Sequence, residues 1–324
     1  MSKVFTILEN SENFKKHYTS VKDIWISPNK FIEYYKDYIV NNMLMFDGDF
    51  WVLIFGYEGS GKSSLSLMIY SNFIKDEDEF IKNMIFSQTE YAKRIHYFVS
   101  NNIKKSCLLI DDAHYVFGKY YTLTKETLSI LQLARFIRDQ QIIHILNTQT
   151  PNQLYRDIWY ERINNFIYCF KEKYFDENEN KFNFNLYAAT YLNSYIIKNN
   201  IDDWRNVSNW RFLLSKYPLD TLTRINDLFE KYSSVYNKYK QIKKFYKEFY
   251  SLFRFKEFVK GNEFELLFRL VKSIATNNFN IDTFPKKFIN KLIEKSIINE
   301  NFNIIDEDVK KLIENNKDII IKKL

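Results

Sequence analysis

The sequence predicts an α/β protein in which helices cover a parallel β-sheet, with a helical N-terminal extension and a mostly helical C-terminal region. Between residues 50 and 190, short apolar runs alternate with segments of helical periodicity, which is the pattern of a parallel sheet covered on both faces. A glycine-rich loop stands directly between the first apolar run and the first helix of this region. We therefore expect an extension over 1–49, a core over 50–190 and a helical region over 191–324.

The composition is typical of a packed globular protein. Of the 324 residues, 46% are hydrophobic and 18% aromatic, whereas six are glycine and four are proline, so long flexible linkers are not expected. Both cysteines, Cys107 and Cys169, lie in apolar runs and are predicted to be reduced core residues. No apolar run approaches the roughly 20 residues that span a bilayer. We expect a cytoplasmic protein without a membrane span.

Local signals place the expected elements along the chain. Ser27 and Pro28 form an N-cap and first-turn pair for a helix in the extension, and an Asp47-Gly48-Asp49 turn precedes the core. The expected strands of the core are 51–55, 84–86, 107–110, 142–146 and 163–170, and the expected helices are 62–73, a helix from 87 onward and 125–138. A polar turn followed by the alternating run KFNFNLY predicts a hairpin after the last strand. After about residue 190, helices dominate.

Three of the six glycines, Gly56, Gly59 and Gly61, lie within six residues between a strand and a helix. With Lys62 and Ser63, they satisfy the pattern G-x-x-x-x-G-K-[ST]. Glycine permits the backbone angles with which consecutive N–H groups surround an anion, and the helix N-terminus adds partial positive charge. The pattern predicts an ATP site in which Lys62 reaches the β- and γ-phosphates and Ser63 binds Mg²⁺. The residues expected to bind the nucleotide are Gly56, Gly59, Ser60, Gly61, Lys62, Ser63 and Ser64.

Polar residues follow two further strands of the predicted sheet. Asp111 and Asp112 end the run CLLIDD, and Asn147, Thr148 and Gln149 end the run IIHILNTQ. Since ligands of open α/β sheets lie at the carboxyl ends of strands, we expect these side chains near the phosphates. Asp111 is expected to complete the Mg²⁺ site, Asp112 to orient or deprotonate the attacking water, and Gln149 to contact the γ-phosphate or that water. The order of the motifs fits an NTPase whose third motif strand lies between the first two.

The segment from Gln132 to Tyr168, together with these motifs, resembles the motor core of the FtsK/HerA superfamily of DNA-translocating ATPases. That family has an arginine-bearing helix, a strand that ends in Thr-Gln near a proline, and an Arg-Ile step into the next strand. The matching residues are Arg138, Thr148, Gln149, Pro151, Arg162 and Ile163. The resemblance covers roughly residues 50 to 170. It implies a homo-oligomer, usually a hexameric ring, with ATP at the subunit interfaces, an arginine supplied in trans and DNA in the central channel.

The resemblance makes Arg138 and Arg162 the candidates for the arginine supplied in trans, with Arg135 third. Such an arginine can raise the rate of phosphoryl transfer by about 10³–10⁵. Two features depart from the family: Asp112 stands where the family usually has Glu, and the first and third motifs are close in sequence. The short spacing is similar to that of compact viral packaging members, which implies a virus or plasmid as the setting.

A second resemblance involves the same motifs. The run CLLIDDAH is also similar to DnaA/DnaC-type AAA+ replication initiators and helicase loaders, in which Asn147 takes the place of a sensor residue. That family needs a helical lid after the last core strand, whereas residues 163–188 predict a hairpin. A nucleotide-gated scaffold with little turnover is a third alternative, because the shorter side chain of Asp112 can slow hydrolysis.

The C-terminal region holds the excess positive charge. Residues 231–260 contain nine basic and two acidic residues, a net +7 that equals the net charge of the whole chain. The basic residues that share one helical face are Lys240, Lys243, Lys244, Lys247 and Arg254, opposite Val235, Ile242, Phe245, Tyr246, Phe249 and Phe253. Such a face predicts contact with DNA phosphates, and a solvated helix face is the alternative. Residues 262–305 loosely resemble a winged-helix module whose reading helix is 285–295.

Overall fold

The computed structural model describes residues 3–118, 125–177, 180–226, 232–256, 258 and 261–323. It divides into two compact units, residues 1–233 and 234–324. The sequence places a boundary at residue 190, whereas residues 191–233 belong to the first unit, because they add a strand to its sheet. The N-terminal extension also packs in the first unit, where Val4 and Leu8 share a buried cluster with Trp51.

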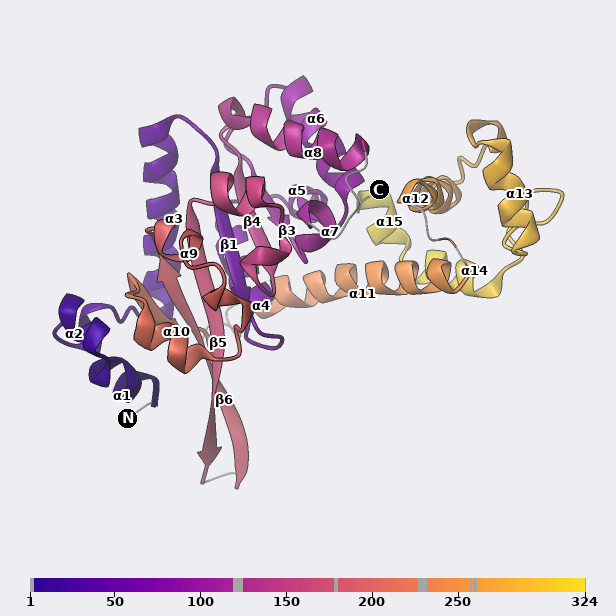
Figure 1. Cartoon of the computed structure of the whole chain (residues 1–324). Helices are drawn as coiled ribbons and strands as arrows, with labels where there is room; N and C mark the ends of the chain where they lie inside the picture. The colour runs from indigo at the N-terminus through magenta and orange to yellow at the C-terminus, as the bar shows by residue number, and fades with distance from the viewer. Residues whose placement is uncertain are drawn as a thin grey trace. The chain divides into compact units, whose positions relative to one another are not determined.

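The described part of the first unit contains a seven-stranded sheet in the order β2-β3-β4-β1-β5-β6-β7 (Figure 1). The strands are β1 (Phe50–Gly56), β2 (Met84–Ile85), β3 (Cys107–Ile110), β4 (Ile143–Thr148), β5 (Asn165–Asp176), β6 (Lys181–Tyr191) and β7 (Thr221–Arg224). Strands β2, β3, β4, β1 and β5 are parallel, whereas β6 and β7 continue the sheet antiparallel. The predicted parallel core is confirmed, and β4, which carries the third motif, lies between the strands that carry the first two.

Helices flank this sheet. They are α1 (Lys3–Asn10), α2 (Glu12–His17), α3 (Pro28–Phe46), α4 (Lys62–Tyr70), α5 (Glu77–Lys82), α6 (Gln88–Ser100), α7 (His114–Phe117), α8 (Lys125–Phe136), α9 (Tyr195–Lys198) and α10 (Trp210–Lys216). At the start of α6, Ser87 Oγ accepts a hydrogen bond from the Glu90 N–H at 3.2 Å, and the Glu90 carboxylate accepts one from the Phe86 N–H at 2.7 Å. Across the described ranges, no helix has both the length and the apolar character that crossing a bilayer requires.

The core of the first unit is built on β1, whose seven residues are all buried. Trp51 on β1 stacks on His144 of β4, with ring centroids 3.9 Å apart and 7° between the ring planes. The Tyr91 hydroxyl lies 3.2 Å from His144 Nε2. Burial lowers the pKa of His144 well below its usual range, so this imidazole is neutral in the folded chain. Cys107 and Cys169 are buried free thiols, as predicted.

Strands β5 and β6 form a hairpin that is longer than the rest of the sheet. The pairing of β1 with β5 ends at Gly56 and Cys169, whereas β5 and β6 stay paired as far as Asp176 and Lys181. Figure 1 shows the two strands projecting beyond the other strands. The hairpin predicted from the alternating run is therefore confirmed, and it extends from the sheet edge at which β1 ends.

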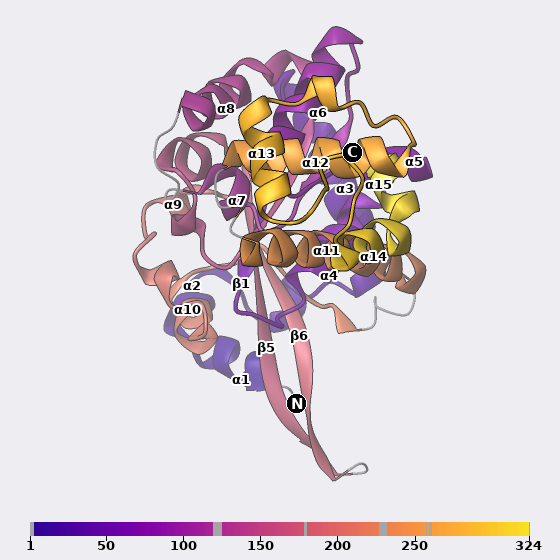
Figure 2. The ribbon, with the colours of Figure 1, turned by 90° about the vertical axis from the view of Figure 1, so that its right-hand side faces the viewer.

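The second unit is helical. Its elements are α11 (Ser233–Phe255), α12 (Gly261–Ala275), α13 (Lys286–Glu294), α14 (Glu307–Asn315) and α15 (Lys317–Lys323), as Figure 2 shows. Phe249 of α11 stacks on Phe268 of α12 with ring centroids 3.9 Å apart. An isolated antiparallel bridge joins Ile298 and Ile304. The sequence of 262–305 predicts two helices and a short hairpin. The structure has the two helices and, in place of hairpin strands, this isolated bridge, and the assignment to a winged-helix module stays a prediction.

Candidate functional site

The glycine-rich loop joins the end of β1 to the start of α4. Gly56, Gly59 and Gly61 have φ angles of +149°, +72° and +89°, conformations that side chains with a Cβ rarely adopt. A Cβ on Gly56 would lie 2.0 Å from the backbone oxygen of Cys169, and one on Gly61 would lie 2.6 Å from Ile225 Cδ1. Gly56 therefore has no room for a side chain, because it packs against the backbone of β5, whereas a side chain at Gly61 would require the end of Ile225, the residue after β7, to move.

Lys62 and the two serines beside it begin helix α4. The Lys62 ammonium donates hydrogen bonds to the backbone oxygens of Gly56 at 2.9 Å and Tyr57 at 3.0 Å. Its charge therefore lies against the first residues of the loop. Ser60 and Ser64, two of the predicted nucleotide-binding residues, are buried.

Polar side chains from three elements meet at the start of α4. Ser63 Oγ lies 3.4 Å from Asp111 Oδ1, and Asn147 Nδ2 donates to the same carboxylate oxygen at 3.0 Å. Asn147 Nδ2 also donates to Ser66 Oγ at 2.8 Å. Asp111 is only 2% exposed, so its orientation is fixed by these contacts. Asn147 thus connects the ends of β3 and β4 to α4.

The donor set of this cluster suits Mg²⁺. A serine hydroxyl and an aspartate carboxylate are hard oxygen ligands, and Mg²⁺ commonly takes only one or two protein ligands and completes its shell with phosphate oxygens and water. Within the described residues there is no cluster of three or more His, Cys, Asp or Glu side chains that could hold a metal. Ser63 and Asp111 therefore fit a metal that is shared with a phosphate-bearing ligand.

Asp112 and Gln149 lie at the same edge of the sheet as the loop. Asp112 is half-buried and has a φ of +48°, a left-handed conformation that Asp tolerates better than most residues. The Ala113 N–H donates to the backbone oxygen of Asn147 at 2.7 Å, which holds the ends of β3 and β4 together. Gln149 is exposed, and its backbone oxygen accepts from the Gly56 N–H at 3.1 Å.

Two residues that shape the site were not predicted from the sequence. Gln153 Oε1 accepts from Thr148 Oγ1 at 2.6 Å and from the Gln149 N–H at 3.2 Å, so it shapes the segment after β4. The signal for Gln153 is the capping-box pattern that begins at Thr150. Ser66 could have been found from its place one helical turn after Ser63.

The candidate arginines lie at the opposite edge of the sheet, where β1, β4 and β5 begin. Arg162 forms an ion pair with Asp49, which precedes β1, and its guanidinium lies 5.4 Å from the Trp51 ring centroid. The two charged side chains are 14% and 5% exposed, so Arg162 is committed to a partner within its own chain. Arg138 is exposed in the 3₁₀ turn Arg138–Gln140 before β4. The Arg135 side chain lies outside the described residues.

Helix α11 has the two faces that its sequence predicts. Its predicted apolar residues are buried apart from the half-buried Val235, and among the predicted basic residues Lys240, Lys244, Lys247 and Arg254 are exposed while Lys243 is half-buried. Lys244 Nζ lies 3.6 Å from Glu248 Oε1, a surface pair that contributes little to stability. The exposed face of α11 is therefore strongly basic.

The chain matches no protein-family model and no curated protein. Among solved structures it is similar to the N-terminal domain of zonular occludens toxin from Neisseria meningitidis, with 17% identity and a TM-score of 0.29 over 44% of this chain and 84% of that one. It is also similar to the genome packaging NTPase B204 from Sulfolobus turreted icosahedral virus 2 in complex with ATP-gammaS, with 16% identity and a TM-score of 0.26 over 42% and 96%. By its own strand order and loop geometry, the chain has the fold of a P-loop NTPase.

Proposed function

We propose that the chain is a Mg²⁺-dependent ATPase that acts as a DNA-translocating motor. The observation that carries the proposal is the meeting of Ser63, Asp111 and Asn147 directly beside a loop whose three glycines have positive φ angles. A loop of this shape presents consecutive N–H groups to an anion, and a hydroxyl with a carboxylate beside it suits the cation that accompanies a nucleotide.

Each residue of the cluster has a defined role in this proposal. The Lys62 ammonium exchanges its contacts with two loop carbonyls for the phosphates, and the buried position of Asp111 keeps its carboxylate aimed at Ser63. Ser63 and Asp111 would hold Mg²⁺, which would supply neutralisation of the phosphate charge. Asp112 or Gln149, at the same edge, orients the attacking water.

DNA is the proposed partner of α11. Its exposed basic face can neutralise backbone phosphates, and such contacts make affinity fall steeply as salt concentration rises. The resemblance to FtsK/HerA motors adds the proposal of a homo-oligomeric ring, in which the exposed Arg138 acts in trans on a neighbour. A virus or plasmid is the proposed setting, and cytoplasm the proposed location.

The AAA+ initiator or loader has less support. After β5 the chain continues into the antiparallel strands β6 and β7, where an AAA+ lid would be helical. The contact of Asn147 with Asp111 is compatible with a sensor role in either class. A nucleotide-gated scaffold differs from both in having little turnover, so the rate of ATP hydrolysis separates it from them.

The test is ATP hydrolysis by the full chain, measured with and without duplex DNA. We expect Mg²⁺-dependent turnover that duplex DNA stimulates, abolished by Lys62→Ala and retained in the control Lys75→Ala, which changes an exposed lysine beyond α4. Turnover that DNA of any length leaves unchanged would refute translocation. Turnover that Lys62→Ala leaves intact would refute the site itself.

The DNA-binding face has its own test. Reversal of charge at Lys240, Lys244 and Lys247 to glutamate is expected to weaken duplex binding and to reduce the slope of log K against log salt by about 0.9 for each lost phosphate contact. The matched control reverses three exposed lysines of the first unit, Lys15, Lys16 and Lys30. Equal losses in both triple variants would show that only net charge matters and that α11 is not the binding face.

A further inference from the structure

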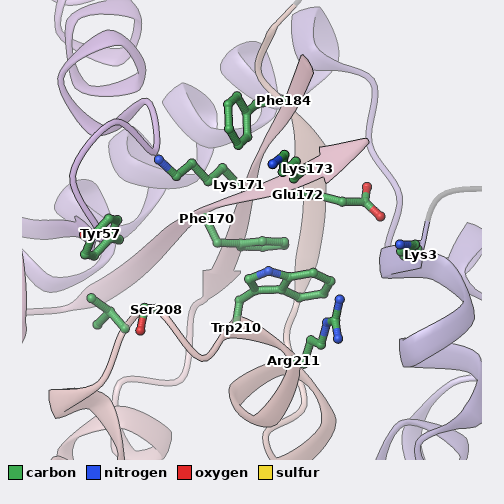
Figure 3. Close-up of a pocket in the computed structure, with 11 residues that line it drawn as sticks. Lys3, Tyr57, Phe170, Lys171, Glu172, Lys173, Phe184, Ser208, Trp210 and Arg211 are labelled. Carbon is green, nitrogen blue, oxygen red and sulfur yellow. The ribbon is translucent and has the colours of Figure 1, made fainter. Parts of the chain in front are cut away.

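Lys171 on β5 lies beside the glycine-rich loop of its own chain. Its Nζ is 3.5 Å from the backbone oxygen of Glu58 and 3.6 Å from the point that a Cβ on Gly59 would occupy. The rings of Tyr57 and Phe184 flank the ammonium, with their centroids 5.5 and 5.1 Å from Nζ. Figure 3 shows Lys171 reaching from its strand toward the loop that carries Tyr57. No motif in the sequence marks this lysine.

The sheet register places Lys171 there. Gly56, the last residue of β1, pairs with Cys169 of β5, and the loop begins immediately after Gly56. Strand β5 continues past this point, and residues two apart on a strand share a face. Lys171 therefore projects on the same face of β5 as Cys169, two residues beyond the point at which the pairing with β1 ends and the loop turns. The tight packing of Gly56 on Cys169 fixes the position of β5 relative to the start of the loop.

The loop carries two ammonium groups on three successive backbone oxygens. Lys62 Nζ contacts the oxygens of Gly56 and Tyr57, and Lys171 Nζ contacts that of Glu58. The two charges have the same sign as the partial charge of the α4 N-terminus, so without an anion they repel each other and that dipole. A polyphosphate relieves this repulsion, because it brings several negative charges to the same loop.

We propose that Lys171 contacts the phosphate tail of bound ATP and supplies a second positive charge to it in cis. This inference rests on the proposed ATP site. The contact with Glu58 is long and solvent-exposed, so it contributes little to holding the loop. The oxygen that Lys171 contacts, that of Glu58, directly follows in sequence the two that Lys62 contacts, so we assign Lys171 to the β- and γ-phosphates that Lys62 is expected to reach.

Lys173 provides a matched control on the same strand. It projects on the same face of β5 two residues farther along, and both lysines line one cavity of about 450 Å³ together with Phe184. Its Nζ lies 3.9 Å from the centroid of Phe182 instead of against the loop. Removing this lysine changes the charge of the hairpin by the same amount as removing Lys171 but leaves the loop contacts in place.

The experiment compares full-length wild type with Lys171→Ala, Lys171→Arg, Lys173→Ala and Lys62→Ala. Calorimetric titration with ATP, ADP and AMP in the presence of Mg²⁺ gives the affinities, and steady-state hydrolysis separates kcat from KM. We expect Lys171→Ala to weaken ATP binding about tenfold while leaving AMP binding within about twofold of wild type, because AMP lacks the β- and γ-phosphates. Lys171→Arg keeps most of the ATP affinity, and Lys173→Ala keeps all of it.

The outcomes separate this inference from the proposed function. If Lys171→Ala binds all three nucleotides as wild type does, or weakens all three equally, Lys171 does not contact the phosphate tail and the inference is wrong. If Lys173→Ala weakens ATP binding as much as Lys171→Ala, only the charge of the hairpin matters and the inference is also wrong. If wild type binds ATP and Lys62→Ala does not, the proposed function is retained in both of these cases. Wild type that binds no ATP overturns both together.

Discussion

Gly56 gives the sharpest test of how the loop is built, because alanine at this position meets backbone rather than a side chain that could move. The added Cβ would lie 2.0 Å from the Cys169 oxygen and 3.0 Å from the Cys169 carbonyl carbon, so β1 and β5 have to separate by about 1 Å. Gly59→Ala is the matched variant. It has a positive φ as well, but the nearest atom to its Cβ is the flexible end of Lys171, at 3.6 Å.

The left-handed conformation costs about 1–2 kcal/mol in either variant. Overpacking against a strand that cannot move adds about 1–3 kcal/mol for Gly56→Ala alone. We expect Gly56→Ala to lower the free energy of unfolding by about 2–5 kcal/mol, or roughly 10 °C in Tm for a unit of this size, and Gly59→Ala by about 1–2 kcal/mol.

Urea unfolding followed by tryptophan fluorescence measures this difference in the right part of the chain. All five tryptophans lie within residues 1–233, so the signal reports the first unit alone. Equal unfolding midpoints for the two variants would refute the claim that the packing of Gly56 on β5 is tight. A loss in Gly59→Ala larger than that in Gly56→Ala would refute it more strongly.

Three further predictions concern the interior of the first unit. Arg162→Ala is expected to lower the free energy of unfolding by about 3–5 kcal/mol, because it leaves the buried Asp49 without its ion-pair partner. It should leave ATP affinity unchanged, because this pair lies at the edge of the sheet opposite the loop. A variant as stable in urea as wild type would contradict this. Burial holds the pKa of His144 well below 6.5 in the folded chain, so only the unfolded chain binds this proton as the pH falls below that value. The free energy of unfolding therefore decreases by up to about 1.4 kcal/mol per pH unit. In denaturation at several pH values, His144→Asn should show a smaller decrease of this free energy with falling pH. Asn147→Ala removes the amide that orients Asp111. We expect the Mg²⁺ concentration that gives half-maximal ATP hydrolysis to rise about tenfold. An unchanged Mg²⁺ titration would exclude that orienting role.

Features that depend on local sequence could be predicted well. The positive-φ glycines follow from the glycine pattern, the strand before the loop follows from an apolar run, and the start of α6 follows from the hydroxyl of Ser87. All of these signals act within a few residues. The position of β4 between β1 and β3 also followed, because the order of polar strand ends restricts the topology.

Features that depend on distant partners could not be predicted. The extent of the first unit was missed because β7 is four residues long, and only its pairing with β6 shows that residues 221–224 belong to the sheet. Arg162 and Asp49 are 113 residues apart in sequence, so no pattern near Arg162 announces that it is paired. The contact of Lys171 with Glu58 spans the same separation.

The register between β1 and β5 links the fold to the proposed chemistry. Because Gly56 pairs with Cys169, position 56 has no room for a Cβ, and the same pairing sets Lys171 against the turn of the loop. A shift of one residue in this register would move Lys171 to the other face of the strand and turn its charge away from the loop. The long pairing of β5 with β6 resists such a shift, because eleven residue pairs would have to move together. The hairpin therefore does more than extend the sheet from β1 toward β7: it fixes which side chain of β5 meets the glycine-rich loop.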